Sequence, residues 1–148
     1  MSTTTSILND LIEILKDGKE GFSTAAQDIG NPELKSTFNQ FSTQREQFAT
    51  QLQTLARDFG DKEPANTGSV AGAIHRGWID LKSALASHDE HAILAECERG
   101  EDAAVSAYRD ALQAQGLPAQ VTTLLNQQFT QVQAAHDQVK ALRDARAK

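Results

Sequence analysis

The stretch from residue 32 to residue 60, PELKSTFNQFSTQREQFATQLQTLARDFG, decides the fold of this 148-residue chain. Its bulky side chains recur at alternating steps of four and three residues without a gap: Leu34, Phe38, Phe41, Arg45, Phe48, Leu52, Leu55 and Phe59. These steps place the side chains along one face of a helix. Pro32 is a typical first residue of a helix, and Gly60 is a typical stop. The stretch therefore predicts a helix over residues 32–59 that packs on other helices through this face.

The rest of the chain shows the same organisation on both sides of this stretch. Apolar residues at helical spacing predict further helices over residues 4–29, 69–86, 87–115 and, after a break at 116–118, up to residue 145. The three prolines, at positions 32, 64 and 118, all fall between these segments, and no dense run of Val, Ile and Thr predicts a strand. We therefore expect an all-α protein that folds as a single domain over residues 1–148.

The helix predicted over residues 69–86 decides between two topologies. At about 1.5 Å per residue it spans roughly 27 Å, which is close to the length of the bundle. A connection of that length returns the chain to its starting end, so that the second and third long helices run parallel. We expect a ferritin-like four-helix bundle with a helical crossover between these two helices. The alternative is a simple up-and-down bundle with the extra helix packed outside.

The composition excludes several classes of protein. The chain carries 14 Lys and Arg against 20 Asp and Glu, a net charge of −6, whereas a nucleic-acid-binding protein presents a basic face. No stretch approaches the roughly 18 apolar residues of a membrane-spanning helix. We therefore expect neither a nucleic-acid nor a membrane partner. The single Cys permits no intrachain disulfide, and the N-terminus has no signal-peptide pattern, so we expect a cytoplasmic protein.

Polar residues interrupt the apolar faces at a common height in the bundle. Arg45 occupies a core position of the second long helix, and Glu101 occupies one at a similar depth in the third. Because those helices would run parallel, the two charges should lie level and form a buried ion pair. The other polar residues that we expect in or near this central layer are Lys19, Glu98, Tyr108, Gln128, Gln133 and His136.

A standard di-iron centre does not fit this layer. Such a centre requires a Glu from each of two helices and a Glu-x-x-His motif from each of the other two. No Glu of the chain is followed by His three residues later, and the nearest equivalent is Gln133 with His136. Arg45 and Lys19 would also repel a metal ion at this height.

Three interpretations of function remain. The first is a non-enzymatic bundle without a cofactor, in which Arg45 and Glu101 form a structural network in place of a di-iron site. The second is a metal-binding or redox protein that holds a single divalent ion or iron through Glu98, Glu101 and His136. The third is a binder of small molecules or anions that uses Arg45, Lys19 or the segment 75–78. We favour the first and expect no enzymatic activity.

Two further features have structural interpretations. Residues 74–78 (IHRGW) include the only Trp of the chain, and we expect Trp78 to seal the crossover helix onto the bundle. Cys97 lies on the predicted core face of its helix, which favours a buried structural thiol over a reactive one.

Several segments, taken together, resemble one known family. They are residues 8–12 (LNDLI), 18–22 (GKEGF), 44–45 (QR), 75–82 (HRGWIDLK) and 95–102 (AECERGED), followed by Tyr108. With these segments the chain resembles a bacterial family of ferritin-like four-helix-bundle proteins that is a domain of unknown function. The resemblance covers nearly the whole chain. It implies a ferritin-like fold and a cytoplasmic bacterial protein, but no activity.

The wider superfamily adds two expectations. Its members bind iron, but this chain departs from their ligand pattern, so the resemblance assigns no metal ligands here. They also tend to form oligomers, which implies a homo-oligomer or a protein partner.

Overall fold

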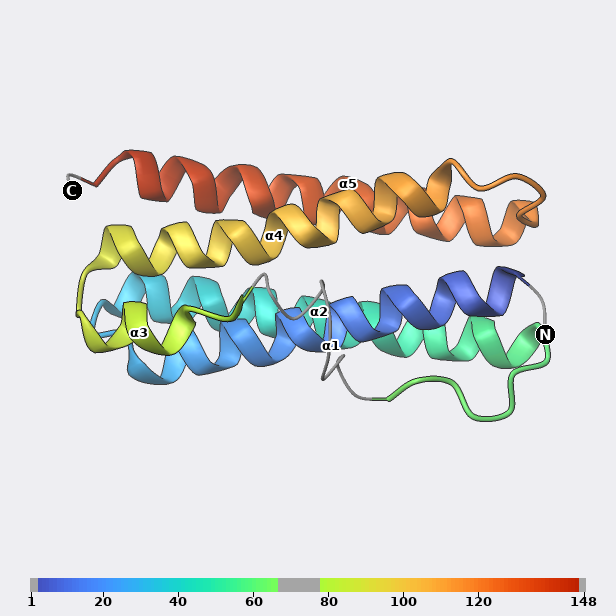
Figure 1. Ribbon diagram of the computed structural model, residues 1–148, viewed down its shortest axis with the longest axis horizontal. Helices are drawn as coiled ribbons and strands as arrows, with labels where there is room; N and C mark the ends of the chain where they lie inside the picture. The colour runs from blue at the N-terminus through green and yellow to red at the C-terminus, as the bar shows by residue number, and fades with distance from the viewer. Residues whose placement is uncertain (1–2, 67–77, 147–148) are drawn as a thin grey trace.

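The computed structural model describes residues 3–66 and 78–146, and this part of the chain is all-helical, without a strand. The elements in chain order are α1 (Thr3–Asp28), α2 (Pro32–Asp58), α3 (Leu81–Ala86), α4 (Glu90–Leu112) and α5 (Ala119–Asp144). The four long helices lie along a common axis, and the short α3 lies at one end of the bundle (Figure 1). The predicted all-α class is confirmed.

The directions of the helices define the topology. The helices α1 and α2 form one antiparallel hairpin, and α4 and α5 form a second (Figure 1). Because α2 and α4 run in the same direction, the chain between them connects opposite ends of the bundle (Figure 1). The up-and-down alternative is therefore wrong. The α1 helix packs along both α2 and α4, whereas α2 and α5 contact each other at only a few points.

The predicted bounds of the long helices agree with the structure to within three residues. The helix predicted over residues 69–86 differs more, because only Leu81–Ala86 is α-helical in its described part, and residues 69–77 lie outside the described residues. The helix predicted from residue 87 begins instead at Glu90. The reason is local: His88 has a φ of 57°, which interrupts the helical backbone. The side chain of Asp89 then caps α4 by accepting from the backbone N–H of His91.

The apolar core consists of two clusters, one toward each end of the bundle. One cluster contains Phe48 and Leu52 of α2, and the other contains Phe38 and Phe41 of the same helix. Arg45 lies between them in the sequence and is itself buried. The same holds in α4, where buried Glu101 separates residues 93–97 of one cluster from residues 104–111 of the other. The polar layer thus divides a core that is otherwise continuous.

Trp78 packs against α1 and α4 just before α3 begins. Its ring meets that of Phe22 edge to face, with centroids 5.1 Å apart. Gly21 and Gly100 leave the space that the indole fills, since a Cβ atom at either position would approach the ring to within 2.4 Å or less. Trp78 therefore packs on the bundle, but it lies outside α3, and residues 69–77 of the helix that it was expected to seal lie outside the described residues.

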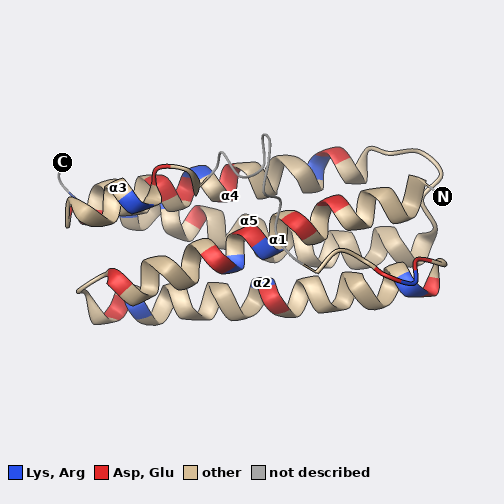
Figure 2. Ribbon diagram, turned by 60° about the horizontal axis from the view of Figure 1, so that its bottom comes forward, with Lys and Arg blue, Asp and Glu red and all other residues tan. Residues whose placement is uncertain are grey.

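The surface of the bundle carries both signs of charge. Lys and Arg are interspersed with Asp and Glu on the helices, and neither sign forms a continuous stripe in this view (Figure 2). Within residues 3–66 and 78–146, no helix is both long and apolar enough to span a membrane.

Candidate functional site

The centre of the bundle holds a buried ion pair between α2 and α4. Arg45 and Glu101 are 1% and 0% exposed. The guanidinium binds the carboxylate through two hydrogen bonds, from Nη1 to Oε1 and from Nη2 to Oε2, the second 2.7 Å long. The third nitrogen of the guanidinium, Nε, bonds to Oε1 of Gln44 at 3.1 Å. Each of the three nitrogens therefore makes a hydrogen bond, and the buried charge is paired with a carboxylate.

The surroundings of Arg45 favour its charged form. Burial lowers its pKa, but the negative charge of Glu101 and the hydrogen bonds to it raise the pKa by more, so the net shift is upward. The ring of Phe22 lies 5.6 Å from the guanidinium carbon and offers a cation–π contact. Gly18 of α1 also faces Arg45 at ordinary contact distance. The pair is thus enclosed by three helices.

A neutral hydrogen-bond chain continues the layer toward α5. The Tyr108 hydroxyl donates to Oε1 of Gln128 at 2.7 Å. The amide nitrogen of Gln128 donates to the backbone oxygen of Phe48 at 3.3 Å and to Oε1 of Gln51 at 2.9 Å. Burial raises the pKa of Tyr108, and the nearby charge of Arg45 only partly offsets that shift. The phenol therefore stays neutral and serves as a donor.

Four residues expected in or near the layer lie outside it: Lys19 and Gln133, which are at the surface, and Glu98 and His136, which belong to a separate cluster. The Lys19 side chain is 39% exposed, and its nearest acidic partner is Glu46, 3.9 Å away. Gly18, not Lys19, faces Arg45, and the next residue of a helix is turned by about 100° from it. Gln133 is also at the surface, where it bonds to Asp137.

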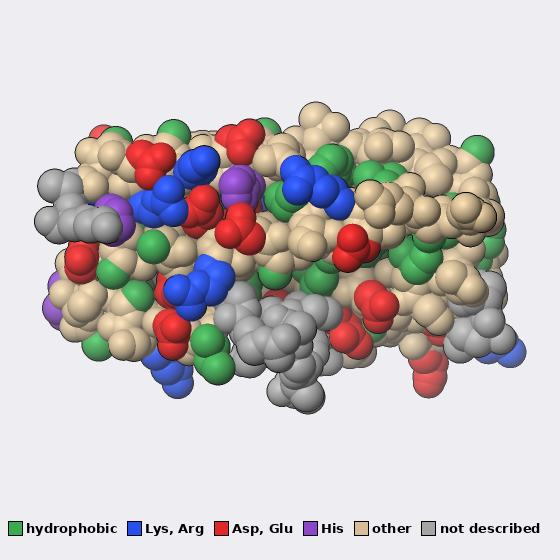
Figure 3. Space-filling view, turned by 45° about the horizontal axis from the view of Figure 1, so that its top comes forward, with side chains coloured by type: hydrophobic (Ala, Val, Ile, Leu, Met, Phe, Trp, Pro, Cys, Tyr) green, Lys and Arg blue, Asp and Glu red, His purple; other side chains and the backbone are tan. Residues whose placement is uncertain are grey.

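His136 and Glu98 form a second cluster, between α4 and α5. His136 Nε2 lies 2.6 Å from Oδ1 of Asp102 and 3.7 Å from Oε2 of Glu98. The other ring nitrogen, Nδ1, lies 3.1 Å from Oδ1 of Asp137. Arg143 Nη1 bonds to the second oxygen of Glu98, Oε1. Acidic, basic and histidine side chains gather on this face of the molecule (Figure 3).

The metal-ligand set expected from the sequence therefore changes by one residue. Both oxygens of Glu101 are bound by Arg45, so Glu101 is not a partner of His136. Asp102 replaces it, because the ligand atoms of Glu98, Asp102 and His136 all lie within 4.8 Å of one another. The spacing of Glu98 and Asp102, four residues apart on one helix, could have indicated this pair from the sequence.

The electrostatics of this cluster centre on the histidine. Burial lowers the pKa of His136, but hydrogen bonds with Asp137 and Asp102 and the charge of Glu98 outweigh it, so the pKa is raised. The carboxylates around His136 thus favour the protonated, positively charged form of its imidazole.

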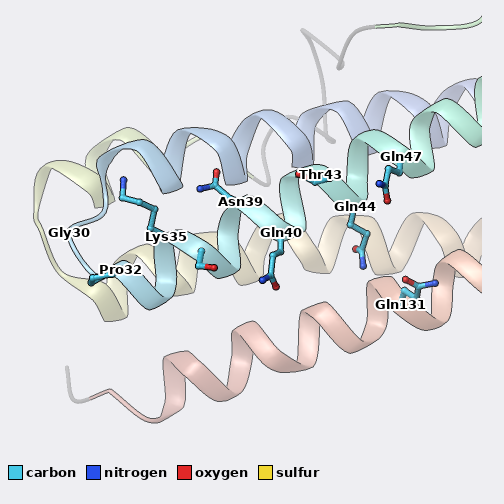
Figure 4. A pocket seen from close by; sticks show the side chains of 10 residues that line it. Gly30, Pro32, Lys35, Asn39, Gln40, Thr43, Gln44, Gln47 and Gln131 are labelled. Carbon is cyan, nitrogen blue, oxygen red and sulfur yellow. The ribbon is translucent and has the colours of Figure 1, made fainter.

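A polar groove runs between α2 and α5, where these helices diverge. It has a volume of about 750 Å³, and Gln40 and Gln44 extend from α2 toward α5 and Gln131 (Figure 4). Lys35, its one charged lining residue in the described part, donates to the backbone oxygen of Ala26 at 2.5 Å. The full lining is Gly30, Pro32, Lys35, Ser36, Asn39, Gln40, Thr43, Gln44, Gln47 and Gln131.

These features define a class of protein: an all-helical bundle with a buried arginine–glutamate pair at its centre and a carboxylate–histidine cluster at its surface. The chain belongs to the family described as Domain of unknown function (DUF2383), whose model matches residues 3–114. The predicted membership of a family of unknown function is confirmed. The matched residues include Arg45 and Glu101, whereas His136 lies beyond them. A search of curated proteins found no match to the chain.

Proposed function

We propose that this protein is a non-enzymatic, ferritin-like helical bundle in which the Arg45–Glu101 ion pair takes the place of a di-iron centre. The directions of α1, α2, α4 and α5, with one long connection after α2, correspond to the single-crossover bundles of ferritin-like proteins. Such a protein acts through its surface, by association with a second copy or with another protein. A bacterial source and a cytoplasmic location stay predictions from the sequence.

The single observation that carries this proposal is the bidentate ion pair. A di-iron centre needs several carboxylates free to neutralise two metal ions. Here both oxygens of Glu101 are bound by a guanidinium, and the neighbouring polar groups, Tyr108 and Gln128, are neutral. A cation at this point would also be repelled by Arg45 at short range. The side chains present do not fit a di-iron centre.

The same contacts weigh against the other two interpretations of the layer. A metal site that includes Glu101 would require its separation from Arg45, which would leave a buried charge without a partner. An anion site at Arg45 would have to draw on a side chain that is buried and whose charge is already paired with Glu101. Lys19 is too exposed to contribute to either.

Iron analysis tests this proposal. The untagged protein and its His136→Gln variant are produced in iron-supplemented medium, and iron is measured by mass spectrometry. The variant is included because it removes a ligand of the surface cluster but leaves the central layer intact. We expect no stoichiometric iron in the variant and no oxidation of added Fe²⁺ in air above the buffer rate. About two irons per chain in the variant would refute the proposal.

Light scattering tests the expected association. A molar mass above that of the monomer, measured over a range of protein concentrations, supports self-association. A monomer at every concentration rules out self-association and leaves another protein as the partner.

A further inference from the structure

We propose that Glu98, Asp102 and His136 form a binding site for a divalent transition-metal ion at the surface between α4 and α5. The site is separate from the Arg45–Glu101 layer and does not depend on the function proposed above. Its ligand atoms are Oε2 of Glu98, Oδ1 of Asp102 and Nε2 of His136, which converge within 4.8 Å of one another. One imidazole with two carboxylates is a donor set that suits ions such as Zn²⁺.

The positions of the three ligand atoms fit such an ion. With metal–ligand distances of about 2.0–2.2 Å, tetrahedral ligand atoms lie roughly 3.4 Å apart. His136 Nε2 and Glu98 Oε2 are already 3.7 Å apart. His136 Nε2 and Asp102 Oδ1 are 2.6 Å apart, so an ion that replaced this hydrogen bond would push them apart by less than about 1 Å. The Asp102 side chain is 63% exposed and has room to move.

Outer contacts already hold two of the ligands in a suitable orientation. Asp137 contacts Nδ1 of His136, which directs Nε2 toward the carboxylates. This arrangement is typical of histidine ligands, whose second nitrogen usually donates to a carboxylate. Arg143 binds Oε1 of Glu98 and leaves Oε2 as the atom that faces His136. Arg143 therefore positions Glu98 without occupying its ligand oxygen.

The local charge also matches a divalent cation. Glu98, Asp102 and Asp137 each carry a negative charge close to His136, and Arg143, which pairs with both Glu98 and Asp144, supplies one positive charge. With a neutral imidazole the cluster is net negative, which favours a divalent cation. Three protein ligands would leave a further coordination position for water, on the side where Asp102 meets solvent. We therefore expect an exchangeable site and not a permanently buried one.

The test is calorimetric titration of the full-length, untagged, chelator-treated protein with Zn²⁺ at neutral pH. We expect one ion per chain for the wild type. His136→Gln and Asp102→Asn should each weaken binding by roughly tenfold or more, because each removes a ligand. The matched control is the double variant His88→Gln with His91→Gln, which removes the two histidines around the start of α4 and should bind as the wild type does.

A second readout guards against variants that lose their fold. Bound Zn²⁺ should raise the melting temperature of the wild type, because a ligand that binds only the folded state stabilises it. The increase should be absent in His136→Gln, whose helical circular dichroism should match that of the wild type without metal. No stoichiometric binding by the wild type would overturn the proposal. Unchanged affinity in both ligand variants, or a loss confined to the His88 and His91 control, would overturn it as well.

Discussion

Gly21 of α1 and Gly100 of α4 make room for the same side chain, the indole of Trp78. A Cβ atom at Gly21 would lie 2.4 Å from Cδ2 of the indole, and one at Gly100 would lie 2.2 Å from Cε2. No real Cβ atom tolerates such contacts without movement of the ring. The two glycines are 79 positions apart in the chain, yet they line the same binding pocket for the indole. Packing of Trp78 in this pocket holds the segment before α3 against the bundle.

Replacement of one of these glycines should displace the indole. We expect Gly21→Ala to destabilise the protein by about 1–3 kcal/mol through overpacking and to shift the emission of Trp78, the only Trp, to longer wavelength. The matched control is Gly18→Ala in the same helix, where the new Cβ would meet Arg45 at 3.6 Å. That change should be neutral or stabilising by up to about 1 kcal/mol. Equal stabilities and emission maxima for the two variants would refute the packing described for Trp78.

The buried ion pair should show strong coupling between its partners. Arg45→Met should lower the free energy of unfolding by about 3–5 kcal/mol, because Glu101 would remain buried without a counter-charge. Adding Glu101→Met should restore much of that loss, since the pair is then replaced by apolar side chains of similar size. Urea denaturation measures both changes.

The exposed pair of Arg99 with Asp80 provides the control for this series. Asp80→Asn should cost less than about 1 kcal/mol, as the loss of a surface ion pair usually does, and it leaves the contact between Arg99 and the buried Glu96 in place. An effect of Arg45→Met no larger than that of Asp80→Asn would show that the guanidinium is not buried against Glu101.

Ionisation of the single tyrosine, Tyr108, should be coupled to unfolding of the bundle at alkaline pH. Burial raises the pKa of Tyr108 in the folded protein, whereas a tyrosine of the unfolded chain ionises near pH 10. The stability that this difference supplies is complete below about pH 10 and is lost as pH rises toward the folded pKa. Tyrosinate absorbance at 295 nm should therefore appear together with the loss of helical circular dichroism. Ionisation of Tyr108 while the helices remain intact would contradict this, and Tyr108→Phe identifies the signal.

Cys97 should be protected from thiol reagents in the native protein. Its side chain is fully buried, and burial, with the charges of Glu101 and Glu96, raises its pKa well above the ordinary value. Because reaction requires both exposure and ionisation, we expect modification at pH 8 to be slower by roughly a hundredfold or more than in denaturant. The Arg45→Met variant should react faster than the wild type, since it opens more often. Equal rates for native and denatured protein would exclude a buried thiol.

Periodicity in the sequence predicts the long helices because it depends on distances along one helix, and it predicts the central ion pair once the directions of the helices are added. The apolar positions of α2 leave Arg45 on the buried face, and the parallel direction of α4 brings Glu101 level with it. The same argument places Lys19 wrongly by one residue. Gly18 is the residue that faces Arg45, and Lys19, the next residue of the helix, is half-exposed.

The surface cluster and the Trp78 contact are harder to predict, because they depend on how helices are rotated about their axes. Asp102, not Glu101, meets His136 for this reason. In the sequence, Gly21 and Gly100 are only poor helix formers, and their role becomes visible once the indole is placed between helices. The start of α4 depends on the backbone of His88, a conformation that side-chain patterns do not encode.

The arrangement as two hairpins has a kinetic consequence. The contacts between α1 and α2 and between α4 and α5 join segments that are near in the chain, so each hairpin can assemble quickly and by itself. Docking of one hairpin on the other must instead close the long connection after α2, at an entropic cost that grows slowly with loop length. Trp78 and the Arg45–Glu101 pair lie at this boundary between the two hairpins. Their contacts should therefore lower the rate at which the hairpins separate during unfolding.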